Sequence, residues 1–375
     1  MNNPAPTANL TIPSDILPED GRFGSGPSRV RPAAVTALAT AASDFLGTSH
    51  RKATVKNMVH RLRSEIAELL QIPDDYEVLL GNGGSTGFWD AATFSLIEQR
   101  SQHLSFGAFS AKFASGVAAA PHLQDPMILT SEPGTHPQPQ ADPSIDAYAL
   151  TQNETSTGVS MELHRPSQQG LVLVDATSGA GGLLFNPLET DVYYFAPQKC
   201  LAADGGLWIA CCSPAALERI ERLGASDRWI PPFLDLSIAL HSSRKNETYN
   251  TPALATIFLT VHQVEWINSN GGLSWAANRC TESANIMYSW AESRSFTTPF
   301  VTDPTIRSHV VATVDLLEVK ADDVAEVLRA NGIVDVESYR GLGRNQLRVA
   351  LFPATPPVDI AALCACIDYV TERLQ

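Results

Sequence analysis

A glycine-rich turn, an aspartate and a lysine are the features of this sequence whose residue types and spacing could support chemistry. The turn reads Gly81-Asn-Gly-Gly-Ser-Thr86 and stands between an expected strand and an expected helix. Backbone N–H groups at a helix N-terminus bind anions, and glycine lets a phosphate approach closely. The turn lacks the Gly-Lys-Ser/Thr ending of a Walker A loop, and Thr86 breaks the pattern G-x-G-x-x-G. A phosphate cup is one interpretation, and a plain turn is the more frequent one.

Asp175 ends the apolar run Leu171–Val174. Short apolar runs bounded by polar residues are typical of buried parallel strands. Open α/β sheets bind ligands at the carboxyl ends of such strands, which makes Asp175 a candidate binding residue. A local role as the cap of the turn Ala176–Gly179 is the alternative, and taken alone the sequence leaves both open.

Lys199 follows a second apolar run, Val192–Phe195, with Gly205-Gly206 just beyond it. A lysine amine forms a Schiff base if its surroundings lower its pKa, although most lysines lie in water at the surface. Pyridoxal phosphate (PLP) requires a phosphate cup, an acidic partner for its pyridine nitrogen and a Schiff-base lysine. The chain offers these in order, so we predict that Lys199 carries PLP.

The elements that must position these residues alternate between strands and helices. Helical spacing of apolar residues predicts a helix over 55–70, a short strand is expected over Tyr76–Leu80, and the turn opens an expected helix over Thr86–Glu98. Such alternation predicts an α/β fold with a mostly parallel sheet. Trp89, at helical spacing, is interpreted as a core residue.

A smaller α/β unit is expected after a break at Asn270-Gly-Gly272. The pattern predicts, in order, a helix, a strand, a helix, a strand and a final helix, at Leu273–Glu292, Ser308–Leu316, Ala321–Asn331, Gln346–Leu351 and Pro357–Leu374. We therefore expect an extended N-terminal arm (1–20), a large cofactor domain (21–270) and a small C-terminal domain (271–375).

Composition excludes several other classes. The 375 residues carry a net charge of −14 and are 44% hydrophobic, which disfavours nucleic-acid binding and allows a large core. No apolar run approaches the ~18 residues of a membrane span. The six cysteines lack metal-site spacing, so no metal is predicted, and free thiols suit a reducing, cytoplasmic location.

Several short motifs recur in an order that resembles the phosphoserine aminotransferases, a family of fold-type-I PLP enzymes in aminotransferase class V. They are Gly24-Ser-Gly-Pro27, Ser49-His-Arg51, the glycine-rich turn, Asn153-Glu-Thr155, Asp175, Ala196-Pro-Gln-Lys199, Tyr249-Asn-Thr-Pro252 and Leu347-Arg348. The resemblance runs from about Gly21 to the C-terminus. It implies a large, mostly parallel cofactor domain and a smaller C-terminal α/β domain.

The resemblance also implies roles at the cofactor. Lys199 would bear it and Asp175 would pair with the pyridine nitrogen, and further contacts would come from Gly84, Ser85, Thr155 and Gln198. An aromatic ring would stack on the pyridine, with Phe109 as the aligned residue and Phe106 as the fallback. Asn250 and Thr251 would reach the cofactor phosphate from the neighbouring subunit of a homodimer. Glu154 would either cap a turn or order the Thr155 loop.

At the substrate, the resemblance assigns the α-carboxylate to Arg348 and the far end to His50 and Arg51. Two departures stand out, because Ser85 and Thr86 replace a common arginine, and the loop Tyr339–Arg344 lacks a common histidine. We hypothesise that Arg340 or Arg344, with Arg51 and Lys52, supplies the missing positive charge. The alternative is that both loop arginines are merely solvated.

The implied activity is transamination between glutamate and 3-phosphooxypyruvate, giving O-phospho-L-serine and 2-oxoglutarate in serine biosynthesis. The family also acts on a phosphorylated four-carbon analogue, 4-phosphohydroxy-L-threonine, in pyridoxine synthesis. A serine–pyruvate or alanine–glyoxylate aminotransferase is the main alternative and would need no phosphate-binding cations. A cysteine desulfurase and a non-catalytic module of the same fold are weaker alternatives, the latter disfavoured by the presence of both Lys199 and Asp175.

Overall fold

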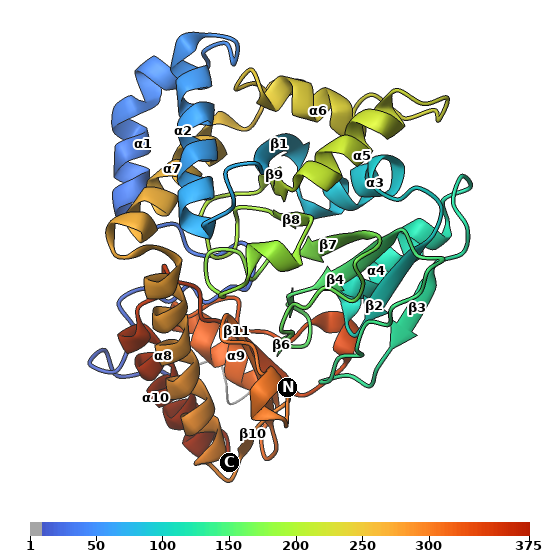
Figure 1. The fold of residues 1–375 in the computed structure, drawn as a ribbon. Coiled ribbons are helices and arrows are strands. Elements are labelled where there is room, and N and C mark those ends of the chain that lie inside the picture. Colours follow the sequence, from blue (N-terminus) through green and yellow to red (C-terminus); the bar gives the residue numbers. More distant parts are fainter. Residues whose placement is uncertain (1–9) are drawn as a thin grey trace, which may run out of the picture.

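The computed structural model describes residues 10–375, so the first nine residues of the predicted arm lie outside the described part. Its centre is a seven-stranded sheet (Figure 1). The strand order is β1 (Glu77–Gly83), β9 (Gly206–Cys212), β8 (Val192–Phe195), β7 (Leu171–Asp175), β4 (Ala147–Thr151), β2 (Ser101–Ser105) and β3 (Met127–Thr130). Strand β9 is antiparallel to both neighbours and every other neighbouring pair is parallel, which confirms a mostly parallel α/β sheet.

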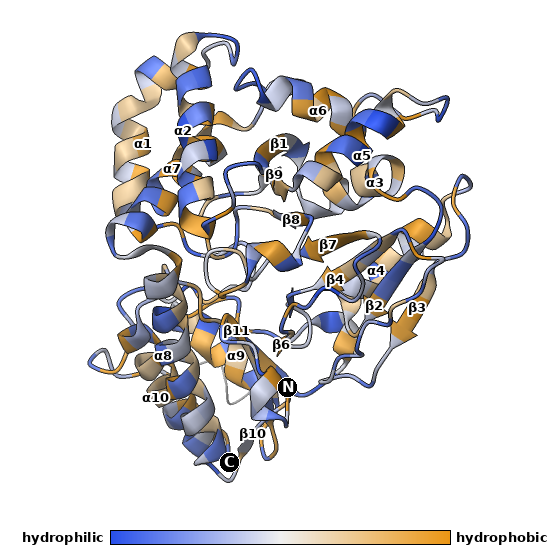
Figure 2. Ribbon diagram, in the orientation of Figure 1, coloured by the Kyte–Doolittle hydropathy of each residue, from blue (hydrophilic) through white to orange (hydrophobic). Residues whose placement is uncertain are grey.

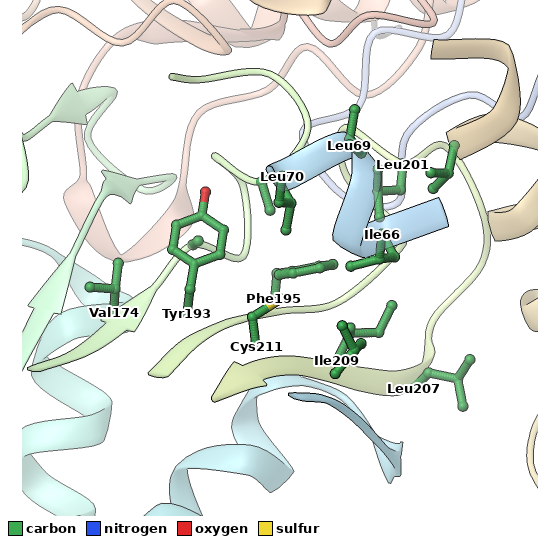
Figure 3. Packing of buried hydrophobic residues seen from close by; sticks show 14 of the residues in the cluster. Ile66, Leu69, Leu70, Val174, Tyr193, Phe195, Leu201, Leu207, Ile209 and Cys211 are labelled. Atoms are coloured by element: carbon green, nitrogen blue, oxygen red, sulfur yellow. The ribbon is translucent and has the colours of Figure 1, made fainter. Parts of the chain in front are cut away.

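Helices cover both faces of this sheet because its central strands are apolar on both sides (Figure 2). One face packs against α1 (Pro32–Phe45), α2 (Ala53–Leu70) and α7 (Leu254–Ser269), and the other against α3 (Ser85–Ser95), α4 (Ala108–Ala118), α5 (Pro214–Gly224) and α6 (Leu236–Ser243). Alternate residues of β7 enter the two cores: Val172 and Val174 the first, Leu171 and Leu173 the second. Figure 3 shows the first core, where Ile66 and Leu70 of α2 lie over Phe195.

The C-terminal part of the chain forms a second unit with its own core. Its three-stranded antiparallel sheet has the order β10 (Thr297–Pro299), β11 (Val311–Leu316) and β12 (Gln346–Ala350), with α8 (Gly272–Glu292), α9 (Ala321–Ala330) and α10 (Pro357–Leu374) packed around it. Ile12 and Phe23 are buried in this core, and Arg22 forms a β-bridge with Val334. The segment from residue 10 to about residue 23 therefore packs with the C-terminal unit.

Most predicted elements are confirmed, and the differences at their ends have local causes. The expected strand at 308–316 begins at Val311, because the Ser308 hydroxyl accepts the N–H groups of Val310 and Val311 and holds a turn there. The helix expected to reach Glu98 ends at Ser95, and the Glu98 N–H donates instead to Asp146.

Four short elements complete the described chain. A small hairpin joins β5 (Asn153–Glu154) and β6 (Val159–Ser160), and 3₁₀ turns span Pro187–Glu189, Pro304–Ile306 and Arg340–Leu342. Within residues 10–375, no helix combines the length and apolar character of a membrane span.

Candidate active site

The carboxyl ends of the parallel strands meet at one edge of the large sheet and bring the predicted residues together. A pocket at this edge is lined by Gly84, Ser85, Thr86, Trp89, Phe109, Thr151, Asn153, Thr155, Asp175, Thr177, Gln198 and Lys199. Asp175 ends β7, and Lys199 follows the neighbouring strand β8. The three segments that suggested a cofactor in the sequence thus border a single cavity.

Lys199 is held at this pocket by the N-terminal loop. Its Nζ donates to the Ser25 carbonyl at 2.6 Å, and its own carbonyl accepts from the Ser28 hydroxyl at 2.7 Å. Gly26 has φ of +139°, and a Cβ there would lie 1.8 Å from Lys199 Nζ, so a side chain at this position would displace the lysine amine. Burial, helped by the positive charge of Arg348, lowers the pKa of the Lys199 amine to about 8. At pH 7 roughly a tenth of this amine is therefore neutral and nucleophilic, compared with well under a thousandth for a lysine with the ordinary pKa of about 10.4.

Asp175 is buried, and its carboxylate is fixed by three donors. Oδ1 accepts the backbone N–H of Thr177 at 2.9 Å and the Thr177 hydroxyl at 2.5 Å, while Oδ2 accepts Nε1–H of Trp89 at 2.9 Å. Burial raises the pKa of Asp175, and the bonds from Thr177 and Trp89 oppose that rise. Asp175 therefore combines the two features considered as alternatives above, because it caps the turn at Thr177 and also lines the pocket.

The glycine-rich turn opens α3 at the pocket. Gly83 has φ of +119°, a conformation that strongly favours glycine, and α3 begins at Ser85. The N–H groups of the first helical turn have no partners within the helix, which makes this end suitable for an anion. The Ser85 hydroxyl also lies 2.6 Å from the Thr177 hydroxyl oxygen, which can accept its proton while donating its own to Asp175, so the turn and the Asp175 loop are joined.

Glu154 organises the aromatic side of the pocket. It is fully buried, and its carboxylate accepts the N–H groups of Phe109 and Ser110, at 3.4 and 2.9 Å, and the hydroxyls of Ser110 and Ser156, at 2.9 and 2.7 Å. It therefore caps α4 and ties it to the Thr155 loop, so both roles considered for it apply. Phe109 lines the pocket, whereas Phe106 is buried in the first core.

Arg348 approaches the pocket from β12 of the C-terminal unit. Its Nη1 donates to the Thr155 carbonyl at 3.4 Å, and its guanidinium lies 5.5 Å from the ring centre of Tyr339. Three buried polar atoms at this place, Arg348 Nε, Asn153 Oδ1 and Gln198 Oε1, have no hydrogen-bond partner among residues 10–375. Unsatisfied buried groups are costly, so a polar ligand in the pocket would stabilise them. The three atoms are one donor, Arg348 Nε, and two amide-oxygen acceptors, and a polar cofactor that carries both acceptor and donor groups fits them.

Four of the predicted residues that lie outside the pocket lining of their own chain form a separate group. Thr251 accepts the Asn82 side-chain N–H through its carbonyl at 2.9 Å, and its hydroxyl lies 3.3 Å from Nδ1 of His50. Asn250 also accepts from Asn82, and Arg51 is exposed with no ion pair in the described chain. His50, Arg51, Asn250 and Thr251 thus gather near one another at the surface rather than at Lys199.

The two loop arginines differ sharply in their surroundings. Arg344 donates through Nε to the buried carboxylate of Asp315 at 3.1 Å and lies over the ring of Phe300 at 4.6 Å. Arg340 is exposed, and within residues 10–375 its side chain makes no ion pair or hydrogen bond. Arg344 is engaged inside the C-terminal unit, so Arg340 is the free cation of this loop.

Sequence reasoning missed Trp89, Thr177 and Ser25 as residues of the site. Trp89 is buried, as expected of a core residue, but it also lines the pocket and bonds to Asp175. A usable signal existed, since Ser85 and Trp89 are four residues apart and share one face of α3. Ser25 lies in the motif Gly24-Ser-Gly-Pro27, to which the resemblance gave no role, and its backbone carbonyl makes the contact with Lys199.

Comparisons with known proteins agree with this geometry. The family model described as Aminotransferase class-V matches residues 137–341. A relative from Mycobacterium sp. (strain KMS) is 58% identical over 370 residues, covering 98% of this chain and 100% of its own. The phosphoserine aminotransferase of Nocardioides sp. (strain ATCC BAA-499 / JS614) is 55% identical over 373 residues, covering 98% and 100%. The crystal structure of a phosphoserine aminotransferase from Cytophaga hutchinsonii has a TM-score of 0.87 at 22% identity, covering 93% and 99%, which shows a shared fold.

Proposed function

The chain belongs to the phosphoserine aminotransferase family within the class V aminotransferases, and from this premise we propose that it transfers the amino group of glutamate to 3-phosphooxypyruvate. The products are O-phospho-L-serine and 2-oxoglutarate, and the role is serine biosynthesis. The observation that carries this proposal is that Lys199, half-buried and with the pKa of its amine lowered to about 8, lines one pocket with Asp175. The four-carbon analogue of pyridoxine synthesis is a second candidate substrate.

Pyridoxal phosphate is the cofactor, and when bound it holds the amino group and delocalises the electrons released at the substrate α-carbon. Lys199 would provide the point of attachment and, as a free neutral amine, the base that moves the α-proton. Asp175 would pair with the pyridine nitrogen through a charge-assisted hydrogen bond. The first turn of α3 would hold the phosphate, and Phe109, Gln198 and Thr155 would contact the rest of the cofactor.

Arg348 binds the substrate α-carboxylate. Its guanidinium offers a planar pair of donors that matches a carboxylate, a geometry that lysine lacks. Its Nε is buried and unpartnered in the described chain, and burial lowers its pKa without removing its charge at neutral pH. An anion bound there would give Arg348 Nε a hydrogen-bond partner and would stabilise the buried positive charge.

The substrate phosphate is assigned to Arg340 with His50, Arg51 and Lys52. Arg340 makes no ion pair with residues 10–375, and it follows Tyr339, whose ring lies 5.7 Å from the ring of Phe109 and 5.5 Å from the Arg348 guanidinium. Because Arg344 already neutralises Asp315, we assign it no part in substrate binding.

We further propose a homodimer in which His50, Arg51, Asn250 and Thr251 serve the partner subunit's site. The support is that these four residues lie together at the surface and outside their own chain's pocket. A cytoplasmic location is supported by six cysteines that are all free and buried, which fits a reducing compartment.

The test of this function compares acceptors. The purified protein, loaded with PLP, is given glutamate and one of 3-phosphooxypyruvate, hydroxypyruvate or glyoxylate, and 2-oxoglutarate is measured. We expect kcat/KM to favour the phosphorylated acceptor by ~100-fold or more, which corresponds to ~2.7 kcal/mol of transition-state binding. Equal kcat/KM values for the three acceptors would still show an aminotransferase, but they would favour a serine–pyruvate or alanine–glyoxylate activity.

A further inference from the structure

Trp89 and Asp175 form a buried pair that links helix α3 to the end of strand β7. Each side chain is 6% exposed, and Nε1–H of the indole donates to Oδ2 of the carboxylate at 2.9 Å. The two residues are 86 positions apart in the chain, so the bond depends on the packing of α3 against the sheet. Both residues line the pocket that contains Lys199.

The bond determines which part of the carboxylate stays available. An ionised aspartate has about four acceptor positions, two on each oxygen. Thr177 occupies Oδ1 with its N–H and its hydroxyl, and Trp89 occupies one position of Oδ2. One position of Oδ2 therefore remains, next to the indole, for a single donor entering from the pocket.

We propose that Trp89 is a positioning residue for the cofactor, whose indole N–H fixes Oδ2 of Asp175 as the acceptor for the pyridine nitrogen. This inference rests on the proposed function and deepens it. Asp175 is the residue that touches the cofactor, and Trp89 acts through it. The contribution of Trp89 is a donor of fixed direction, because the ring cannot rotate within its packed surroundings.

The neighbours of Trp89 explain why its direction is fixed. Its ring stacks on Phe113 at 6.0 Å with an interplanar angle of 13°. Tyr194 is paired with Asp175 in the sheet register, yet its hydroxyl is buried without a hydrogen-bond partner among the described residues. Within residues 10–375, Trp89 is thus the aromatic residue whose donor forms a hydrogen bond with Asp175, although the Tyr194 hydroxyl also lies near that carboxylate.

Two substitutions distinguish the effect of the indole N–H from the effect of the size of the ring. Trp89→Phe keeps an aromatic ring and removes the N–H. Trp89→His removes the six-membered part of the indole but can place Nε2–H where Nε1–H stands, since the two five-membered rings superpose. A donor role requires the phenylalanine variant to be the more impaired in cofactor binding, and a packing role requires the reverse.

Trp290→Phe is the matched control. Trp290 is 7% exposed and donates Nε1–H to Asp368 at 2.9 Å, but it lies in α8 of the C-terminal unit. The same chemical change is thereby made to the same type of bond, away from the pocket. Its effect measures the loss of stability from removing a tryptophan–aspartate bond alone.

The measurements are the PLP dissociation constant, from titration of the cofactor-free protein, together with kcat, KM and the melting temperature. For Trp89→Phe we expect about 10-fold weaker PLP binding and about 10-fold lower kcat, with the KM for glutamate within about twofold of wild type. Trp89→His should recover most of both losses, and Trp290→Phe should lower only the melting temperature.

The inference is overturned if Trp89→Phe binds PLP with wild-type affinity, or if Trp89→His binds it more weakly than Trp89→Phe does. If one variant does not fold, the affinity of the other against wild type still decides, because a donor role predicts near-normal binding for histidine and a clear loss for phenylalanine. The affinity for PLP, and the half-reaction in which glutamate transfers its amino group to the cofactor, can both be measured without any acceptor. A wild-type protein that binds PLP but ignores 3-phosphooxypyruvate would contradict the proposed function and leave this test intact.

Discussion

The cofactor end and the outer substrate end of the site are built in contrasting ways. At the cofactor end, Asp175 is buried and has three donors, and Lys199 is bonded through both its amine and its carbonyl. At the outer end, Arg51 and Arg340 are exposed and carry no ion pair within the described chain. The cofactor end is thus a buried, hydrogen-bonded sheet edge, whereas the outer end, which we propose binds the substrate phosphate together with a second subunit, presents exposed charges.

This difference predicts which end of the site should affect the rate of the reaction and which should affect the affinity for substrate. Preorganised, buried groups act at the reacting atoms, where low polarity strengthens them. Exposed cations are screened by solvent and salt, so each contributes less, and mainly to the affinity for a charged substrate. Substitutions at the two ends should therefore differ in both size and kinetic character.

The largest effect is expected from Lys199→Ala. Without the amine, no covalent attachment forms and no base moves the α-proton, so turnover should fall by at least about 1,000-fold. Steady-state kinetics with glutamate and 3-phosphooxypyruvate measure the loss, and dialysis shows whether remaining PLP is held only noncovalently. Substantial turnover in this variant would show that another group performs the chemistry.

A smaller effect is expected from Glu154→Gln, which tests the cofactor end of the site at a residue that does not contact the reacting atoms. One carboxylate oxygen becomes an NH₂ group facing the Ser110 donors, so α4 loses its cap and Phe109 its fixed position. Bonds to a charged group are worth about 1.5–3 kcal/mol, so a loss of about 2 kcal/mol in unfolding free energy is expected, with weaker PLP binding. Denaturant unfolding and PLP titration measure the two quantities.

Glu154→Asp supplies the comparison for that prediction. It keeps the charge and should retain part of the stability if the carboxylate is what matters. Unchanged PLP affinity in Glu154→Gln would mean that the position of Phe109 does not depend on this cap.

The smallest effect is expected at the exposed end, from Arg340→Ala. It should raise the KM for 3-phosphooxypyruvate about fivefold and leave that for hydroxypyruvate unchanged, because only the former carries the phosphate. Arg344→Ala is the matched control from the same loop. Its arginine is paired with Asp315, so it should lower stability and affect both acceptors alike. Equal losses for both acceptors in Arg340→Ala would remove Arg340 from the phosphate site.

The sequence predicted the features that are set by residues close together in the chain. It missed the contacts that are set by how distant segments pack. Apolar periodicity was sufficient for the helices at 55–70 and 357–374, and strand ends were sufficient to draw attention to Asp175 and Lys199. The bond from Trp89 to Asp175, the cap of α4 by Glu154 and the pairing of Arg344 with Asp315 each join segments between 29 and 86 residues apart. Their partners are set by how elements pack, which one chain's pattern does not encode.

The N-terminal segment illustrates the same limit. Its prolines and lack of periodicity suggest an extended arm, and residues 10–20 contain no helix or strand. Nothing in that pattern reveals that Ile12 enters a core whose other buried members, apart from Phe23, lie beyond residue 280. A few apolar residues without periodicity have too many equivalent docking sites to be assigned from sequence.

The most direct test of the account is the pH dependence of PLP attachment to the cofactor-free protein. Borohydride reduction at each pH, followed by peptide mass spectrometry, gives both the site and the initial rate. A lysine whose pKa is lowered is neutral over a wider pH range, so the rate should rise with pH and reach half its maximum near pH 8, with the label on Lys199. Labelling of a different lysine, or a midpoint near the ordinary lysine value of about 10.4, would contradict the account.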